Sequence, residues 1–381
     1  MKVLKYLNDL SLEGGCGKAL ETLTEELGIK VTYNEKYNLY VLNYSQINSP
    51  KTHPIVTECR SLVLSIDEAK SSFYVVSRSF DRFLNLGENG NEKKIDITKM
   101  KAYEKLDGSL VGLFFHKGEW LYRTKSMIMP DIEMYADAFG NTWKDLIEGV
   151  LFLETFNITA NADMVNCTFI LELTSPVNRI VTRYTESKVT LLAIRDKNGA
   201  YLTQDTNTFC AKLSGWETPI SYKFDTIEDC KRTAEELPNL EEGYVLYDEH
   251  GVPQCKVKSP TYLAIHRLRG ESIPTPKRIM DLVFTKEVDE YLAYFPEDTH
   301  LFTPYIWAFQ ELCSDYTEKE EKFSDIEDQK EYALAVKEFP FAGLLFQKRK
   351  NKNLKFTEMF NKLSNNAKYK MVTKYLKKEI N

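Results

Sequence analysis

The sequence predicts an α+β protein in which a domain built on antiparallel sheets is followed by an all-helical domain. Short runs of β-branched and aromatic residues, separated by polar turns, dominate residues 39–258. These runs do not alternate regularly with helices, as they would in a Rossmann fold. Beyond about residue 275 they cease, and helical periodicity replaces them. We therefore expect a first domain over residues 1–275 and a helical domain over residues 276–381.

The first domain is expected to begin with a short helix and to continue mainly with strands. Leu20, Leu23 and Leu27 share one helical face, and Gly28 is suited to end that helix. The glycine-rich segment 14–18 lacks the residues of a phosphate-binding Walker loop and is interpreted as a helix-start turn. Strands are predicted at 39–44, 61–64, 73–77, 110–115, 120–123, 168–173, 189–194, 243–247 and 254–258, and helices at 130–152 and 226–237.

Proline and capping residues predict the helix boundaries of the last third of the chain. Thr303 is expected to cap a helix that has Pro304 at its first position. Ser324 and Glu327 are spaced as a capping box for a second helix, which Pro340 would end.

Composition and charge exclude several classes of protein. The seven cysteines form no C-x-x-C pair, which argues against a zinc site or a disulfide framework. Without an apolar run of 18 residues we expect no membrane association and a cytoplasmic protein, in the host cytoplasm if it is viral. Residues 348–381 carry 11 basic and 2 acidic residues although the net charge is −6, so this basic block is a candidate for holding phosphates.

The chemistry is predicted to centre on the K-x-D-G motif at Lys105. A lysine at a strand end, followed by a tight glycine turn and a new strand, presents one amine to a cleft. Alone the motif is weak, because a charged residue that enters a β-turn explains it equally well. Further motifs strengthen it: Glu172 lies inside an apolar strand, Glu242 begins another, and Lys256 and Lys258 share the face of a third. Two ammonium groups on one face repel each other unless anions lie between them.

Taken in this order, the motifs resemble the covalent nucleotidyltransferase superfamily of polynucleotide ligases and messenger-RNA capping enzymes. More narrowly they resemble the RNA ligase 1 of T-even bacteriophages. The resemblance spans about residues 55–265 and rests on Glu58–Arg60, Ser77–Asn85, Lys105–Leu110, Pro176–Val181, Glu242–Val245 and Lys256–Ser259. It implies an adenylyltransferase domain in residues 1–275. It also implies an ATP-dependent RNA ligase that joins 5′-phosphate and 3′-hydroxyl ends through a lysyl-adenylate and an RNA-adenylate in RNA or tRNA repair.

The resemblance also implies roles for individual residues. Lys105 would be the nucleophile, and Glu242, with Glu172, would hold Mg²⁺ or Mn²⁺ or its water; Asp289 is a candidate for a second metal. The ATP-binding residues would be Arg60, Arg82 (a lysine in the relatives), Lys125, Glu172, Lys256, Lys258 and Tyr262. Because only a neutral lysine attacks phosphorus, we expect nearby cations to lower the pKa of Lys105 from its usual value of about 10.4.

Two alternatives stay open at this point. A DNA ligase or a GTP-dependent capping enzyme would normally continue from the K-x-K strand into an oligonucleotide-binding barrel, whereas helices follow here. A non-catalytic RNA-binding protein of the same fold would be expected to have lost at least one of the charged site residues. The expected partner is RNA, either single-stranded or a nicked tRNA, bound by a monomer.

Overall fold

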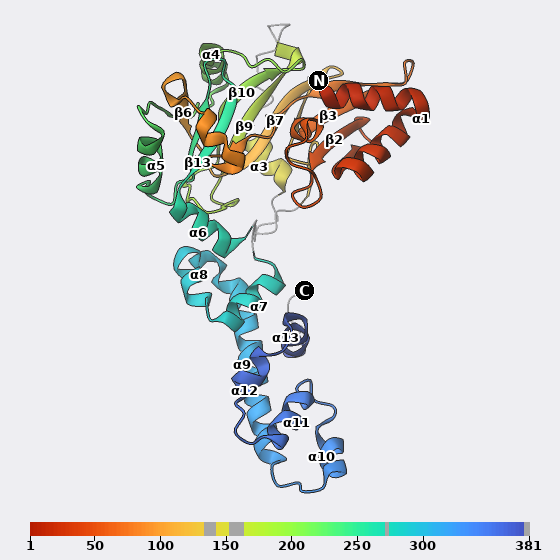
Figure 1. Ribbon diagram of the computed structural model, residues 1–381, viewed down its shortest axis with the longest axis vertical. Coiled ribbons are helices and arrows are strands. Elements are labelled where there is room, and N and C mark those ends of the chain that lie inside the picture. The colour runs from red at the N-terminus through yellow and green to blue at the C-terminus, as the bar shows by residue number, and fades with distance from the viewer. Residues whose placement is uncertain (133–141, 152–163, 271–273, 377–381) are drawn as a thin grey trace. The chain divides into compact units, whose positions relative to one another are not determined.

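The computed structural model describes residues 1–132, 142–151, 164–270 and 274–376. The chain divides into two compact units, Met1–Arg267 and Leu268–Asn381. The first unit contains three sheets with flanking helices, and the described elements of the second are all helical (Figure 1). The predicted α+β class with antiparallel sheets is therefore confirmed. No helix in the described ranges is long and apolar enough to cross a membrane.

The first sheet has the strand order β1-β2-β3-β4 and is antiparallel throughout. Helix α1 (Lys2–Leu27) lies against this sheet (Figure 1), and its apolar side chains pack on one face of it. Val3, Leu7 and Leu23 are fully buried there, each contributing roughly 1.5–3 kcal/mol. The strands are β1 (Ile29–Asn34), β2 (Leu39–Tyr44), β3 (Arg60–Asp67) and β4 (Ser72–Ser77), and the short helix α2 (Pro54–Glu58) precedes β3.

Helix α1 is longer than the sequence predicts. Its second half matches the expected helix, and Gly28 ends it in the left-handed conformation with its N–H bonded to the carbonyl of Thr24. Gly15 has non-helical backbone angles (φ 80°, ψ 166°), so the glycine-rich segment forms a kink within α1. The first helical turn is capped from a distance, because the Glu58 carboxylate accepts the N–H groups of Lys2 at 3.1 Å and Val3 at 2.8 Å.

The second and third sheets form the centre of the first unit. The second has the order β10-β9-β7-β8, and the third has the order β11-β6-β12-β13-β5. All their pairs are antiparallel except the short pair of β13 with β5. The strands are β5 (Leu84–Asn85), β6 (Lys101–Glu104), β7 (Ser109–His116), β8 (Glu119–Arg123), β9 (Cys167–Thr174), β10 (Lys188–Asp196), β11 (Ser221–Tyr222), β12 (Gly243–Tyr247) and β13 (Pro253–Lys258).

Apolar side chains pack behind each of these two sheets and also between them. Helices α3 (Trp143–Leu151) and α4 (Gln204–Ser214) contribute to the core behind the second sheet, and α5 (Ile227–Glu235) contributes to the core behind the third. Between the sheets, Ile170 and Ala193 of the second pack with Tyr103, Val245 and Tyr247 of the third. The functional residues described below lie beside this shared layer. Helix α6 (Pro260–Arg269) follows β13.

The second unit is built from helices around an aromatic-rich core. They are α7 (Pro276–Thr285), α8 (Val288–Tyr294), α9 (Thr299–Lys322), α10 (Gln329–Val336), α11 (Ala342–Lys350), α12 (Phe356–Asn361) and α13 (Asn365–Val372). Two predicted starts were wrong. Helix α9 begins a turn before Thr303, because Phe302 is buried in the core and Pro304 removes only one intrahelical bond. Helix α10 is capped by Asp328, whose carboxylate accepts the Glu331 N–H at 2.8 Å, rather than by Ser324.

Candidate active site

Lys105 lies where the chain passes from the third sheet to the second. Strand β6 ends at Glu104, and β7 begins at Ser109 in the other sheet. The backbone N–H of Lys105 donates to the carbonyl of Gly243 at 2.8 Å, which holds Lys105 beside the start of β12. The local sequence predicted the strand, the turn and the next strand. It did not reveal that the turn joins two different sheets.

The turn after Lys105 requires glycine at its last position. A Cβ atom on Gly108 would lie 2.3 Å from the carbonyl oxygen of Leu173, much closer than packing allows. This close approach lets the Gly108 N–H donate to the Glu172 carboxylate at 3.1 Å. The glycine of the motif thus connects the Lys105 turn to the strand that carries Glu172.

Asp107 anchors the same turn from the other side. This carboxylate is buried and accepts the backbone N–H groups of Val181 at 2.7 Å and Thr182 at 2.8 Å, and the hydroxyl of Tyr262 at 2.6 Å. Sequence reasoning gave Asp107 no role, although an aspartate between Leu106 and a glycine was the available signal. Tyr262 holds Asp107 in place through this hydrogen bond, and its expected contact with the nucleotide stays a prediction.

Glu242 bridges two of the predicted lysines. Its carboxylate is 4% exposed and lies 2.6 Å from the Nζ of Lys105 and 2.7 Å from the Nζ of Lys258. The register of the third sheet explains this meeting, because Gly243 pairs with Lys258 across β12 and β13. Gly243 has a φ of +136°, and a Cβ atom there would lie 2.0 Å from the Val257 carbonyl oxygen. The glycine after Glu242 therefore lets the two strands approach at this level.

The charge on Lys105 differs from the expected one. Burial lowers the pKa of Lys105, but the carboxylates of Glu242 and Glu172 outweigh burial and hold this pKa above its ordinary value. The expectation that neighbouring cations lower the pKa of Lys105 is thus wrong for the protein without nucleotide. The physical reason is distance, since Glu242 contacts the Lys105 amine directly.

Lys256 is the lysine whose pKa is lowered. Burial, together with the positive charges of Arg60, Lys105 and Lys258, brings its pKa to about 7. Its Nζ lies 4.8 Å from the centre of the Phe83 ring, and the guanidinium of Arg60 lies 5.4 Å from the same centre. Near neutral pH this amine therefore exists as a mixture of charged and neutral forms.

The pKa of Glu172 lies above the ordinary value for a glutamate. Burial raises the pKa of Glu172 to about 7, although the positive charge of Lys105 opposes the shift. A carboxylate in this position gains stability when a cation or a hydrogen-bond donor approaches it. Glu172 and Lys256 both titrate near neutrality, so the site can adjust its charge to a bound ligand.

These side chains line a cavity of about 170 Å³. One part of its wall is apolar and the other is charged, which suits a ligand with a flat ring and an anionic group. The lining residues are Arg60, Phe80, Phe83, Tyr103, Glu104, Lys105, Leu106, Leu110, Glu172, Leu192, Pro219, Val245, Tyr247, Lys256 and Lys258. The Lys105 side chain is 22% exposed and faces this cavity rather than open solvent.

Five of the predicted site residues do not line the cavity. Two of them, Glu242 and Tyr262, lie behind it and contact Lys105 and Asp107 as described above. Arg82 forms an ion pair with Glu88 at 2.6 Å. Lys125 is exposed, and its backbone carbonyl accepts the Asn43 side-chain amide at 2.7 Å. Asp289 lies exposed in the first turn of α8, in the second unit. The roles expected for these residues remain predictions.

A family model described as RNA ligase matches residues 58–262, a span that includes every predicted site residue except Asp289. The chain belongs to this RNA ligase family. A protein of Autographa californica nuclear polyhedrosis virus, provisionally assigned as a bifunctional polynucleotide kinase/RNA ligase, is 30% identical over 98% of this chain and 53% of its own length. An RNA ligase of Rhodothermus phage RM378 is 24% identical over 61% of this chain and 65% of its own length.

The chain spans about half to two thirds of the length of these curated relatives. Among solved structures, an archaeal ATP-dependent RNA ligase (form 1) is similar with a TM-score of 0.48 and 13% identity, over 90% of this chain and 80% of that one.

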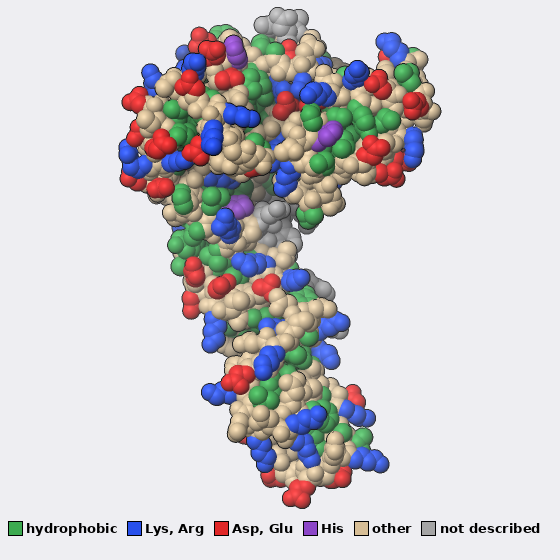
Figure 2. All heavy atoms as spheres, viewed as in Figure 1, with side chains coloured by type: hydrophobic (Ala, Val, Ile, Leu, Met, Phe, Trp, Pro, Cys, Tyr) green, Lys and Arg blue, Asp and Glu red, His purple; other side chains and the backbone are tan. Residues whose placement is uncertain are grey.

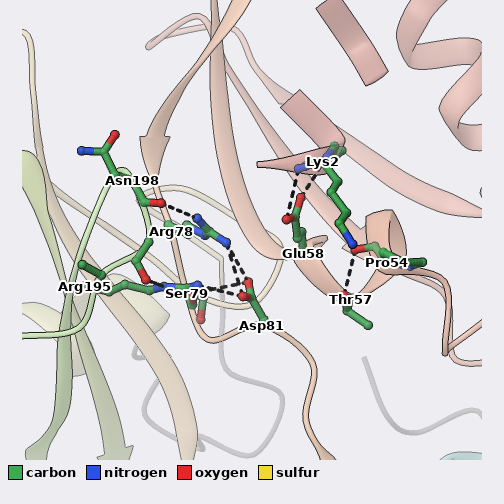
Figure 3. A network of polar contacts seen from close by, with 12 residues as sticks. Lys2, Pro54, Thr57, Glu58, Arg78, Ser79, Asp81, Arg195 and Asn198 are labelled. Carbon is green, nitrogen blue, oxygen red and sulfur yellow. Dashed lines mark hydrogen bonds and ion pairs between the residues drawn. The ribbon is translucent and has the colours of Figure 1, made fainter. Parts of the chain in front are cut away.

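In this member of the RNA ligase family, two buried arginines hold the loop after β4 through ion pairs with the partly exposed Asp81 (Figure 3). The guanidinium of Arg195 contacts the Asp81 carboxylate at 2.7 Å, and Arg78 contacts it at 3.3 Å. The loop carries Phe80 and Phe83, which line the cavity. Asp81 thus helps to position the Phe83 ring, which Arg60 and Lys256 contact. Sequence reasoning did not assign this role to Asp81.

The carboxylates of the site fit a divalent cation only together with ligand oxygens. Divalent cations such as Mg²⁺ take oxygen ligands. Among the described residues, no group of three or more His, Cys, Asp or Glu side chains is arranged to hold a metal. Both oxygens of Glu242 contact lysines, and Glu172 is half protonated near pH 7. A cation that also bound phosphate oxygens would supply the positive charge that these two buried carboxylates favour.

Proposed function

We propose that this protein is an ATP-dependent RNA ligase that joins 5′-phosphate and 3′-hydroxyl RNA ends through an adenylate on Lys105. The observation that carries the proposal is the buried Glu242 carboxylate between Lys105 and Lys258, at the charged end of a cavity whose other walls are apolar. This arrangement holds a primary amine beside further cations, where an attacked phosphate would lie. Membership of the RNA ligase family supports the reaction class.

The lining of the cavity suggests how ATP is held. The apolar wall formed by Leu110, Leu192 and Val245 suits the adenine ring, and Glu172, which lines the same cavity, would accept hydrogen bonds from the ribose hydroxyls. Lys256 and Arg60 line the charged part and would contact the phosphates. Because Lys256 has a pKa of about 7, a phosphate beside it would draw a proton onto its amine.

Lys105 must lose its proton before it can attack. Its charge is maintained by Glu242 and Glu172, so any change that neutralises these carboxylates leaves burial and the nearby cations to lower the pKa of Lys105. A divalent cation, Mg²⁺ or Mn²⁺, would be held by Glu242 and Glu172 and would neutralise negative charge on them and on the phosphates. The two carboxylates therefore act as a switch for the nucleophile, protecting it as an ammonium until the nucleotide is bound.

The proposed reaction has three steps. The neutral Lys105 amine attacks the α-phosphorus of ATP, an N–P bond forms as the nitrogen releases a proton to water, and pyrophosphate leaves with the electron pair of the broken P–O bond. An oxygen of the RNA 5′-phosphate then attacks the same phosphorus, and the N–P bond breaks as the lysine nitrogen takes up a proton. Finally the RNA 3′-hydroxyl loses its proton and attacks the 5′-phosphorus, which expels AMP and seals the strand.

We assign the adenylyltransferase chemistry to residues 1–275 and contacts with the RNA to the helical residues 276–381. The preferred substrate would be single-stranded RNA or a nicked tRNA, and the active form a monomer in the cytoplasm. The basic block at residues 348–381 supports the RNA-binding role of the helical part. Figure 2 shows lysine and arginine side chains spread over the visible surface of this unit.

Labelled nucleotide tests the proposal. Incubation with ATP labelled at the α-phosphate should give a labelled protein, and unlabelled ATP should support the sealing of RNA that carries 5′-phosphate and 3′-hydroxyl ends. Lys105→Ala should abolish labelling, whereas the matched control Lys101→Ala, on the exposed side of β6, should retain it. Labelling with GTP alone would instead identify a capping-type enzyme, and the sealing of nicked DNA but not RNA would identify a DNA ligase.

A further inference from the structure

Lys368 of α13 is a buried lysine without an acidic partner. It is 8% exposed, and its Nζ lies 5.8 Å from the ring centre of Phe284 and 5.7 Å from that of Phe360. Within the described ranges, no carboxylate and no hydrogen-bond acceptor contacts its ammonium group. Contacts with these two rings hold the side chain in place, and the ammonium is left without a hydrogen-bond or ion-pair partner from the protein.

A surface hollow gives this ammonium access to a ligand. The hollow has a volume of about 540 Å³ and is lined by residues of α7, α12 and α13 and their ends: Asp281, Phe284, Thr285, Lys286, Asn361, Asn365 and Lys368. Lys286 adds a second ammonium group from the residue that ends α7. The only acidic residue of the lining, Asp281, already accepts a hydrogen bond from the Asn365 amide at 3.0 Å.

The hollow therefore combines features that recognise an anion. Two lysines outnumber one carboxylate, and Asn361 and Asn365 carry amide groups that donate hydrogen bonds. The first turn of α13 also borders the hollow at Asn365, where backbone N–H groups and the helix dipole favour negative charge. The hollow takes residues from elements at both ends of the helical unit's sequence.

We propose that this hollow binds a backbone phosphate of the RNA substrate, with Lys368 and Lys286 as its cationic contacts. The inference rests on the proposed function for the identity of the substrate and adds a defined site to it. Two other cations of the basic block have structural partners instead. Lys348 lies 3.3 Å from a Glu320 oxygen, and Arg349 donates to the carbonyl of Ile326 at 2.6 Å. Lys368 is thus better placed than these two to receive a phosphate.

The salt dependence of RNA binding tests this site. Affinity for a fluorescent single-stranded RNA should be measured by anisotropy at several salt concentrations for Lys368→Met, Lys286→Met and the control Lys370→Met. Methionine keeps an unbranched apolar side chain against the two rings and removes the charge. Lys370 lies exposed on the same helix and does not line the hollow, so its variant makes the same change in net charge.

We expect Lys368→Met and Lys286→Met each to reduce the slope of log affinity against log salt, by up to about 0.7, the value for one phosphate on a single strand. Lys370→Met should leave the slope unchanged. Equal slopes for all three variants and the parent protein would overturn the proposal. If Lys368→Met does not fold, as a thermal melt would show, the exposed Lys286→Met carries the same test.

Labelling with ATP separates this inference from the proposed function. Both hollow variants should form the protein adenylate at the parental rate, because the substitutions lie outside the first unit. A protein that fails to react with ATP, yet loses salt-dependent RNA binding in these variants, would contradict the proposed ligase and support the phosphate site. A protein that reacts with ATP, but whose two hollow variants bind RNA with unchanged salt slopes, would support the proposed ligase and contradict the phosphate site.

Discussion

Replacing Glu242 by glutamine should convert Lys105 from a lysine with a raised pKa into one with a lowered pKa. Glutamine keeps the shape of the side chain but removes the charge that lies 2.6 Å from Lys105 and 2.7 Å from Lys258. Burial and the neighbouring lysine charges then oppose the Lys105 ammonium, and only Glu172 and the weaker influence of Asp107 still favour it. The pKa of Lys105 should fall below its ordinary value of 10.5.

The same substitution should also destabilise the protein. Removing one member of a buried ion pair costs about 3–5 kcal/mol. The lysine side chains are 22% and 23% exposed, so water and proton loss reduce the cost, and we expect the lower end of that range. The loss should shrink at alkaline pH, where the unpaired lysines are neutral. Denaturant unfolding at pH 7 and at pH 10 measures this difference.

Competitive trace acetylation reports the protonation of Lys105. The protein and a free lysine peptide are acetylated together at a series of pH values, and the Lys105 peptide is quantified by mass spectrometry. In the parent protein the reactivity of Lys105 should rise at higher pH than that of the free peptide, and in Glu242→Gln it should rise at lower pH. An unchanged or upward-shifted curve in the variant would refute the reasoning that Glu242 keeps Lys105 charged.

Three further outcomes follow from the site. At pH 8 Lys256, with a pKa of about 7, is mostly neutral, so AMP binding should take up a proton. Calorimetry in buffers of different ionisation enthalpy measures this proton uptake, and Lys256→Met should abolish it. The pKa of Glu172 is about 7, above its ordinary value of 4.5, so this residue contributes about 3 kcal/mol of stability at low pH that is lost as pH rises from 4.5 to 7. Glu172→Gln should flatten that part of the pH profile of the unfolding free energy. An unchanged profile would refute the raised pKa. Gly108→Ala should destabilise the protein by more than 1 kcal/mol. Its control, Gly149→Ala, lies in open space on α3 and should stabilise the protein by up to about 1 kcal/mol. Equal effects of the two substitutions would contradict the close approach at Gly108.

The sequence identified the strands and the charged residues of the site because both depend on local patterns. Apolar runs between polar turns located the strands that carry Glu172 and Lys256, and the K-x-D-G motif located the turn at Lys105. The period of two along a strand placed Lys256 and Lys258 on one face, and both line the same cavity.

The remaining features depend on contacts between distant segments. The membership of β6 and β7 in different sheets is set by the pairing of β6 with β12 and of β7 with β9, strands more than 50 residues away, which no local pattern encodes. The charge state of Lys105 depends on whether a carboxylate or a cation is nearer, and the pairing of β6 with β12 decides that because it brings Lys105 beside Glu242. Similarly, the motif containing Arg82 could not reveal that Glu88 is its ion-pair partner.

Mapping the site of adenylation is the most direct test of the central claim. Lys105 and Lys256 line the same cavity, and before nucleotide binds Lys256 is the less charged of the two. We nevertheless assign the nucleophile to Lys105, because binding of the nucleotide should reverse that order. After reaction with ATP, proteolysis and mass spectrometry should find AMP on the peptide that contains Lys105. AMP on Lys256 instead, or no covalent adenylate on either lysine, would contradict the assignment.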